Sequence, residues 1–289
     1  YFIMSIKLDW EMDGQIQRGV GEDPNASRKR RLRAIRLLIF LIVITSIGIG
    51  GYIFVDQRLN QVTKQLETEL RDTVIAEVTA IRVGDWDAYR EIQRSADTAW
   101  IENEQRANFM AYQDLFRNGA SVELEGNILF LEIDNDVPRA RVHVEEIIDG
   151  VAYTRIWFYW RYSEDEDNDG LLDGWKHTRP DYTFWGATQT LEGQYATITY
   201  RDVDERVAQD LMTYLNQMVE LACTSRDCAN LPRLRADISP EGYGALMWSP
   251  SDRNLLLVPS PYANKARSDM PFSPEMQAQV ATLLARWFG

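Results

Sequence analysis

Histidine and cysteine are both scarce in this chain of 289 residues, which contains two of each. Zinc peptidases with the H-E-x-x-H motif need two histidines on one helix face and a glutamate that activates water. Because His143 and His177 stand far apart in the sequence, no zinc-peptidase site of this kind lies within these residues. Cys223 and Cys228 lack the CxxC spacing of a redox or zinc site, and no histidine lies near them.

Positive charge is also in short supply after residue 55, where 23 Lys/Arg accompany 39 Asp/Glu. Binding nucleic acid requires a basic face, so an acidic body of this kind repels the phosphates and nucleic acid is excluded as the main partner. Residues 1–36 differ, with eight Lys/Arg and five Asp/Glu. This segment is expected to form a polar, basic cytoplasmic tail.

Charged residues are missing altogether from Leu37–Val55. As a helix this stretch spans about 28 Å, close to the hydrocarbon thickness of a bilayer. Six basic residues and no acidic one lie in Arg28–Arg36, and the positive-inside rule keeps such a flank cytoplasmic. The stretch is longer than the apolar part of a cleavable signal peptide, and no A-x-A site follows it. These features predict a single-pass inner-membrane anchor over residues 37–55, with the later domains in the periplasm or at the cell exterior.

This topology places both cysteines on the oxidising side of the membrane, where disulfides persist. The offset of five residues between Cys223 and Cys228 suits a local disulfide across a helix end. We therefore predict that the two are bonded to each other.

A helical period follows the anchor, with apolar residues at steps of three and four: Leu59, Val62, Leu66, Leu70, Val74, Val78 and Ile81. It predicts a juxtamembrane helix over residues 56–83. This helix is expected either to self-associate as a short coiled coil in a homo-oligomer, or to pack on the domain that follows. Gly84 is expected to end it, and Asp85 to cap the next helix.

The period changes to two after about residue 121, which predicts antiparallel strands with a turn at Asp149-Gly150. One face of this sheet is interpreted as core. The other is predicted to be aromatic and basic, formed by Arg139, Arg141, Tyr153, Arg155, Trp157 and Tyr159. It is either an exposed amphipathic face or a contact surface, because Tyr, Trp and Arg favour interfaces. His143 is assigned to the non-core face and His177 to a turn, and neither is assigned as a catalytic base.

The order of a helix, the turn VGDWDAY, a second helix and a long antiparallel sheet resembles the nuclear-transport-factor-2-like (SnoaL-like) cone fold, over roughly residues 60–186. The resemblance implies a cone-shaped domain with a pocket. That family includes enzymes with a pocket histidine or aspartate, and also members that only bind or dimerise. Spacing alone assigns no acid–base pair to the pocket of this chain.

Residues 187–289 read as a smaller α/β segment. The stretches YATITYRDVDERV and LLLVPSPY resemble the N-terminal part of peptidase-MA-like, gluzincin-related segments of bacterial membrane proteins. Those enzymes carry H-E-x-x-H, from which this chain departs. The ending ARWFG leads us to expect a gene product that continues past Gly289.

The acidic stretch from Asp165 to Lys176 matches the start of a calcium loop, D-x-D-x-D-G. Its predicted oxygen donors are the backbone carbonyl of Leu171 and the carboxylates of four aspartates: Asp165, Asp167, Asp169 and Asp173. Lys176 stands where an EF-hand has a bidentate glutamate, so we expect weak binding, with a Kd of roughly 10⁻⁴–10⁻³ M. The alternative is a hairpin tip whose acids are solvated.

Together these features predict an α+β protein with a tail (1–36), an anchor (37–55), a helical stalk (56–83), a cone-like domain (84–186) and an α/β segment (187–289). The expected function is that of a non-catalytic, membrane-anchored scaffold or accessory subunit whose exterior domains bind a partner protein or a larger membrane complex. One alternative is a peptidase-related enzyme whose metal-binding half lies beyond this chain, or a lyase or isomerase using the cone pocket. Another is an exterior module that binds a small molecule or calcium.

Overall fold

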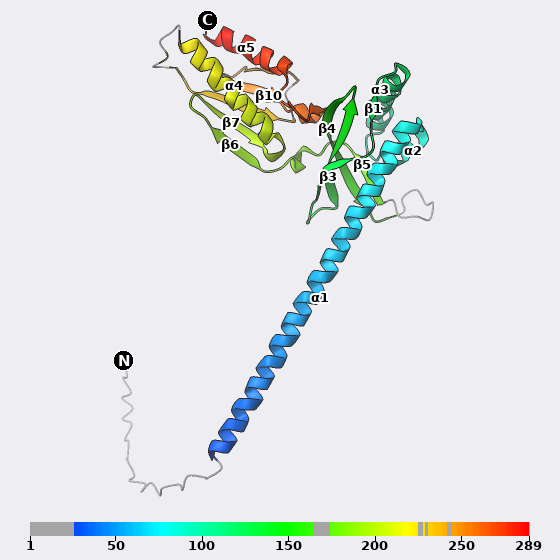
Figure 1. The fold of residues 1–289 in the computed structure, drawn as a ribbon, viewed down its shortest axis with the longest axis vertical. Helices are drawn as coiled ribbons and strands as arrows, with labels where there is room; N and C mark the ends of the chain where they lie inside the picture. The colour runs from blue at the N-terminus through cyan, green and yellow to red at the C-terminus, as the bar shows by residue number, and fades with distance from the viewer. Residues whose placement is uncertain (1–25, 165–173, 225–227, 229–230, 242–243, 289) are drawn as a thin grey trace, which may run out of the picture. The chain divides into compact units, whose positions relative to one another are not determined.

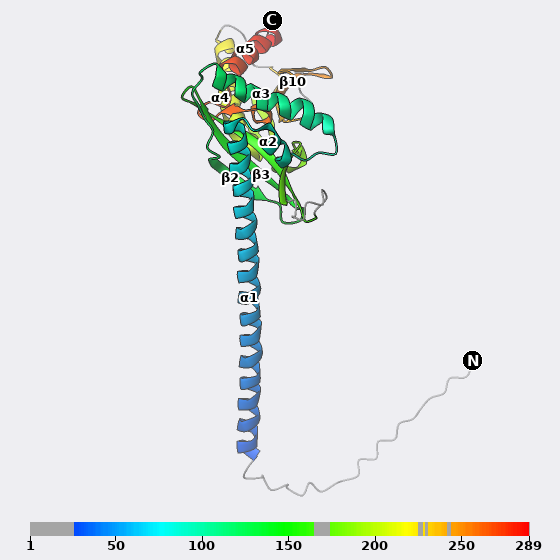
Figure 2. The same cartoon turned by 90° about the vertical axis from the view of Figure 1, so that its right-hand side faces the viewer.

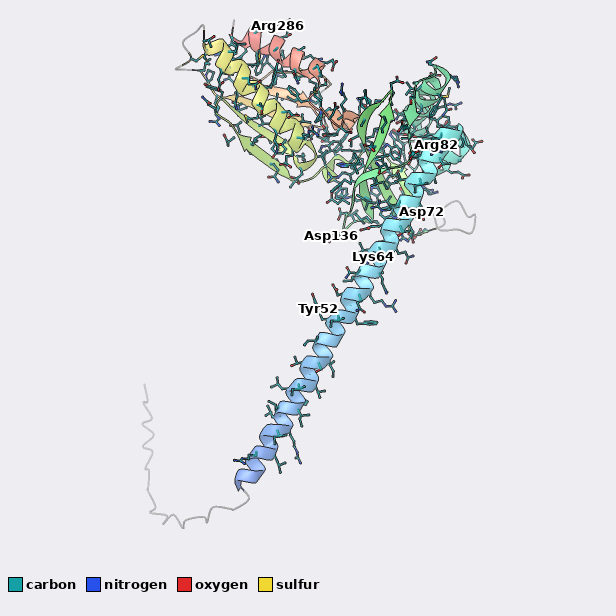
Figure 3. All side chains as sticks on the ribbon, in the orientation of Figure 1. Tyr52, Lys64, Asp72, Arg82, Asp136 and Arg286 are labelled. Atoms are coloured by element: carbon teal, nitrogen blue, oxygen red, sulfur yellow. A yellow bond between two sulfur atoms is a disulfide. The ribbon has the colours of Figure 1, made fainter. Side chains whose placement is uncertain are left out.

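The computed structural model describes residues 26–164, 174–224, 228, 231–241 and 244–288. The chain divides into two compact units, residues 1–63 and 64–289. Helix α1, Ala26–Val83, contributes to both of them (Figure 1). Lys64, where the second unit begins, is labelled on this helix in Figure 3.

The described part of the first unit is the beginning of α1. Every side chain from residue 37 to residue 55 is exposed, although most are apolar. Within the described ranges, α1 is the one helix that is long and apolar enough to cross a membrane. By length and composition, it is compatible with the predicted single-pass anchor.

The second unit begins with the last turns of α1, which pack on the domain that follows. Leu70, Val74, Val78 and Ile81 are at most 1% exposed and belong to a core shared with the first sheet. Gly84, at φ +76°, ends the helix, and the Asp85 carboxylate accepts a hydrogen bond from the Ala88 amide at 3.0 Å. The predicted N-cap is therefore present. The helices that follow are α2 (Trp86–Ile92), the π-helix η1 (Trp100–Gln105) and α3 (Arg106–Arg117).

The first sheet is antiparallel and carries these helices on one face (Figure 2). Its spatial order is β1-β3-β4-β11, with β2 also paired to β3 and β5 also paired to β4. The α+β class predicted from the sequence is confirmed by this arrangement. The strands are β1 (Val122–Glu123), β2 (Ile128–Ile133), β3 (Arg139–Ile148), β4 (Val151–Tyr162), β5 (Gly174–Thr178) and β11 (Ala266–Arg267).

The register between β3 and β4 corrects the predicted aromatic and basic face. Directly opposed residues of an antiparallel pair point to the same side of the sheet. Val142 lies opposite Trp157, and Ala140 opposite Tyr159, so both aromatic side chains are on the core face, at 5% and 0% exposure. Arg141, opposite Phe158, points to the other side.

The predicted six residues therefore do not form one surface: Arg139 and Arg141 lie on one face, and Tyr153, Arg155, Trp157 and Tyr159 on the other. The two-residue turn causes this register. Asp149 and Gly150 both have positive φ (50° and 79°), and Ile148 pairs with Val151 across them. Odd-numbered residues of one strand consequently oppose even-numbered residues of the other.

The second sheet has the order β6-β7-β8-β10-β9, with β7, β8 and β10 parallel and the outer strands antiparallel. Helices α4 and α5 pack on it, and their shared core is apolar (Figure 1). The elements are β6 (Thr188–Glu192), β7 (Ala196–Arg201), α4 (Glu205–Cys223), β8 (Leu234–Ser239), β9 (Met247–Ser249), β10 (Asp252–Pro259) and α5 (Pro274–Phe288).

Strand β11 joins the two halves of this unit. It follows the second sheet in the chain but pairs with β4 of the first, with Ala266 opposite Thr154. The Ser268 hydroxyl lies 2.9 Å from that of Thr154, and the Ser268 amide donates to the Ala152 carbonyl. The edge of β4 is thus covered partly by β5 and partly by a strand from the C-terminal half.

Candidate functional site

Buried polar side chains gather where the helices meet the first sheet. They come from separate elements: Glu77 from α1, Gln93 from the end of α2, Gln105 from η1, Glu146 from β3 and His177 from β5, all at most 6% exposed. Burying such groups costs free energy unless each finds a partner, so their concentration in one place marks the region as chemically distinct.

Glu77 is the centre of the first group of contacts and is completely buried. One carboxylate oxygen lies 2.6 Å from His177 Nδ1 and accepts from Gln93 Nε2 at 3.0 Å. The other accepts from the Tyr159 hydroxyl at 2.8 Å. In the tautomer with the proton on Nδ1, His177 donates to Glu77 and its Nε2 remains an acceptor.

The His177 ring is held among aromatic side chains. The centroids of Tyr159, Trp157 and Trp100 lie 5.2, 5.4 and 5.9 Å from its own. Burial, and then the nearby Glu77 carboxylate, raise the pKa of Tyr159 well above its ordinary value, so this hydroxyl stays a donor. Packing and hydrogen bonding together fix the orientation of the imidazole.

A second group of contacts surrounds Tyr112 on α3. Its hydroxyl donates to a Glu146 oxygen and accepts from Arg155 Nη1 at 2.8 Å. The other Glu146 oxygen lies 3.1 Å from Lys265 Nζ, which comes from the segment just before β11. Burial alone lowers the pKa of Arg155, but the neighbouring Tyr112 and Glu146 raise it above the ordinary value. The guanidinium is therefore a permanent cation.

Between these groups lies a cavity of 230 Å³. Its polar lining includes Tyr89, Glu104, Gln105, Asn108, Tyr112, Arg155 and His177, so one exposed carboxylate lies at the cavity as well as the guanidinium. Tyr89 donates to Gln105 Oε1 at 2.7 Å, so part of the lining is already paired internally. Among the described residues, the Tyr112 hydroxyl is the one hydrogen-bond acceptor of Arg155, whose guanidinium has five N–H donors. The cavity thus presents a cation with spare donors together with a fixed imidazole.

The six residues of the predicted contact surface lie in different environments, and only some of them are near the cavity. Arg155 and Trp157 line the cavity, Tyr159 supports Glu77, and Tyr153 lies beneath Lys265, whose Nζ is 4.9 Å from its ring. The remaining two are committed elsewhere. Arg139 pairs with Asp134 and Asp181 at 2.8 and 2.6 Å, and Arg141 with Glu132 at 2.6 Å, on the opposite face.

The two histidines also differ in place. His143 lies on the face away from the helices, as predicted, and its ring is 4.8 Å from that of Phe130. Burial, and then the Arg141 charge, lower its pKa to about 4. His177 lies in β5 and not in a turn, and it reaches the buried cavity.

Two signals in the sequence pointed to this missed site. Glu77 falls within the apolar stripe of Val74, Val78 and Ile81, where a charge is buried. Trp175 and His177 alternate with period two, as on one face of a strand.

Of the other predicted sites, the disulfide lies within the described residues and the calcium site does not. Cys223 and Cys228 form a disulfide in the structure. Asp165, Asp167, Asp169, Leu171 and Asp173 lie outside the described residues, so the calcium site stays a prediction. In the part of the chain that is described, no group of three or more His, Cys, Asp or Glu side chains is arranged to hold a metal ion.

Comparisons with protein-family models, with curated proteins and with solved structures found no match to this chain. The resemblances to the cone fold and to peptidase-MA-like segments therefore rest on the quoted motifs alone. Any function for the cavity has to be argued from its own geometry.

Proposed function

We propose that this chain is a single-pass membrane protein whose exterior α+β unit binds a small carboxylate-bearing molecule in the cavity between Arg155 and His177. The observation that carries the proposal is the Arg155 guanidinium, which lines the cavity with donors that the described protein groups leave unused. Arginine matches a carboxylate with two parallel N–H···O bonds, and such charge-assisted bonds are about twice as strong as neutral ones.

The size of the cavity limits the ligand. At 230 Å³ it falls below the roughly 300–1,000 Å³ of sites that hold drug-sized molecules. Its walls combine aromatic rings, such as Trp100 and Trp157, with a few oriented polar groups. This combination suits a compact organic acid with a short apolar part and a second polar group near His177.

Binding of a partner protein, the role first expected from the sequence, has less support. Its predicted contact surface divides between two faces, and Trp157 and Tyr159 are buried. The anchored exterior location remains part of the proposal, with α1 as the anchor. A small ligand is the better explanation for polar groups that point inward.

A second candidate function is acid–base chemistry on the same ligand, favoured by the 2.6 Å contact between Glu77 and His177. A carboxylate that holds Nδ1–H leaves Nε2 to take a proton from a bound molecule, and it stabilises the imidazolium that results. This candidate requires the anion site as well, because Arg155 would position the substrate.

The test is calorimetric titration of the full chain in detergent with two- to four-carbon carboxylic acids, and with the corresponding neutral amides as controls. Wild-type protein should bind at least one acid and none of the amides. Arg155→Met should weaken binding at least tenfold, because a bidentate charged contact is lost. Arg155→Lys should recover only part of that loss.

Arg161→Met is the matched control, because Arg161 lies on the same strand but pairs with Glu69, at 3.3 Å. It should leave acid binding within twofold of wild type. His177→Asn keeps a donor for Glu77 and removes Nε2, so it should abolish any turnover while binding persists. Equal losses in the Arg155 and Arg161 variants, or heats as large with amides as with acids, would show that the cavity is not an anion site.

A further inference from the structure

A second, larger cavity lies in the C-terminal half of the unit, away from the polar site. It measures 480 Å³, and its walls include Trp248, Trp287, Phe288, Leu231 and Pro232. The rings of Trp248 on β9 and Trp287 on α5 are stacked, with centroids 6.3 Å apart. These residues, with the two arginines described below, are called the tryptophan cleft.

The two indoles are fixed in position. Trp248 Nε1 donates to the Leu283 carbonyl at 3.3 Å, and Trp287 Nε1 donates to Asn254 Oδ1 at 3.1 Å. Because both N–H groups are already used, the rings offer the cleft mainly apolar surface. Rigid aromatic walls lose little conformational entropy when they bind a partner.

The cleft carries positive charge in an otherwise acidic protein. Arg253, at the start of β10, and Arg286, near the end of α5, both line it and are both exposed. Arg286 is labelled on α5 in Figure 3. Neither arginine has an ion-pair or hydrogen-bond partner among the residues that the structure describes. The chain as a whole has a net charge of −13, but these two arginines give the cleft a local positive charge, which favours an acidic segment there.

The cleft is continuous with a neighbouring space, so it is longer than a single side chain needs. A second space of 120 Å³ shares Leu231, Pro232 and Trp287 with it and continues to Tyr195. An elongated groove with apolar walls and charges at its rim matches an extended chain better than a compact molecule.

We propose that the tryptophan cleft binds an acidic peptide segment of a partner protein, with one large apolar side chain against Trp248 and Trp287 and carboxylates on Arg253 and Arg286. The cleft is separate from the organic-acid cavity, so the two proposals fail independently. Aromatic and arginine side chains of this kind contribute most of the binding energy at protein interfaces.

The experiment measures fluorescence polarisation of labelled peptides with the full chain in phosphatidylcholine nanodiscs. The peptides are GEEFEEG, its basic counterpart GKKFKKG, and GEEGEEG, which lacks the aromatic side chain. The first should bind at least tenfold more tightly than either of the others. Arg253→Glu together with Arg286→Glu should weaken it at least tenfold, and these exposed substitutions leave the core intact.

Arg71→Glu together with Arg82→Glu is the matched control, because it changes the net charge equally at exposed positions of α1. It should change the affinity for GEEFEEG by less than twofold. The proposal is overturned if both double variants weaken binding alike, or if the three peptides bind equally. It is also overturned if phosphatidylglycerol vesicles bind through Arg253 and Arg286 while no peptide does.

Discussion

The two sheets of the second unit have cores of opposite character. Of the ten buried polar or charged residues in the described part of the chain, eight lie before residue 187, around the first sheet. The other two lie near the junction of the two halves, where Asp204 accepts hydrogen bonds from Ser260 and Trp185. The core under α4 and α5 is otherwise apolar.

The two kinds of core contribute differently to the stability of the fold. Burying apolar side chains stabilises the folded state without any need for specific partners, by about 25 cal/mol per Å². A polar core gains little unless every group is paired, so it persists where the groups serve another purpose. In the two proposals, the second sheet binds a ligand on its surface, at the tryptophan cleft, whereas the first binds one among its buried polar groups.

The largest effect should come from removing the carboxylate at the centre of the polar core. Glu77→Ala leaves His177, Tyr159 and Gln93 without their acceptor, and should lower the free energy of unfolding by roughly 3–5 kcal/mol. Urea unfolding of the full chain in detergent measures it. Glu69→Ala is the control on the same helix, because Glu69 is partly exposed and paired with Arg161, and it should cost about 1 kcal/mol or less. Similar losses in both variants would show that the buried contacts of Glu77 stabilise the protein no more than a partly exposed ion pair does.

A smaller effect should appear at the junction. Burial raises the pKa of Asp204 from 3.8 to about 6, although the hydrogen bonds from Ser260 and Trp185 oppose this. A carboxyl whose pKa is raised on folding adds stability below its unfolded value, and that contribution is lost as pH rises from about 4 to 6. The loss amounts to about 3 kcal/mol.

Asp204→Asn should abolish this part of the pH dependence, because the amide keeps an acceptor for Trp185 and does not titrate. Its unfolding free energy relative to wild type should therefore rise between pH 4 and pH 7. The lowered pKa of His143 acts in the opposite direction, removing stability as pH falls from 6.5 towards 4, but it is common to both proteins and cancels. The exposed Glu205→Gln serves as control. Parallel pH curves for wild type and Asp204→Asn would contradict the prediction.

The smallest effect concerns the predicted calcium loop of the first half. At ten times Kd, calcium should raise the stability of the full chain by about 1.4 kcal/mol, a melting shift of a few degrees. Asp167→Asn with Asp169→Asn should remove the shift, and magnesium should substitute poorly because it demands compact octahedral geometry. No shift at millimolar calcium would leave the loop as a solvated hairpin tip.

The sequence was most informative where one physical rule decides. Apolar length predicted the helix that contains Leu37–Val55, and Asp85 was recognisable as a cap from its position after Gly84. A two-residue turn at Asp149-Gly150 already sets which residues of the two strands oppose each other, so the sequence contains the information needed to assign the sheet faces. Alternation within one strand does not by itself say which face of the neighbour it shares.

The candidate site was harder to predict because it is assembled from distant segments. Glu77 and His177 are a hundred residues apart, and Lys265 reaches Glu146 from the far half of the chain. The local hydrophobic pattern and the composition do not predict which distant residues come into contact. The local signs were the charge of Glu77 within an apolar stripe, which requires a buried polar partner, and the alternation of Trp175 and His177.

Strand β11 determines whether the two halves of the second unit can be produced separately. A gene fragment ending at residue 186 would lack Ala263 and Asn264 of the cavity lining. It would also lack Ala266 and Arg267, which cover part of one edge of β4, and Lys265, which pairs with Glu146. Its product would expose an unpaired strand edge and a buried carboxylate without its cation, which favours aggregation. We therefore expect the two halves to fold as one unit, so that neither is stable when expressed alone.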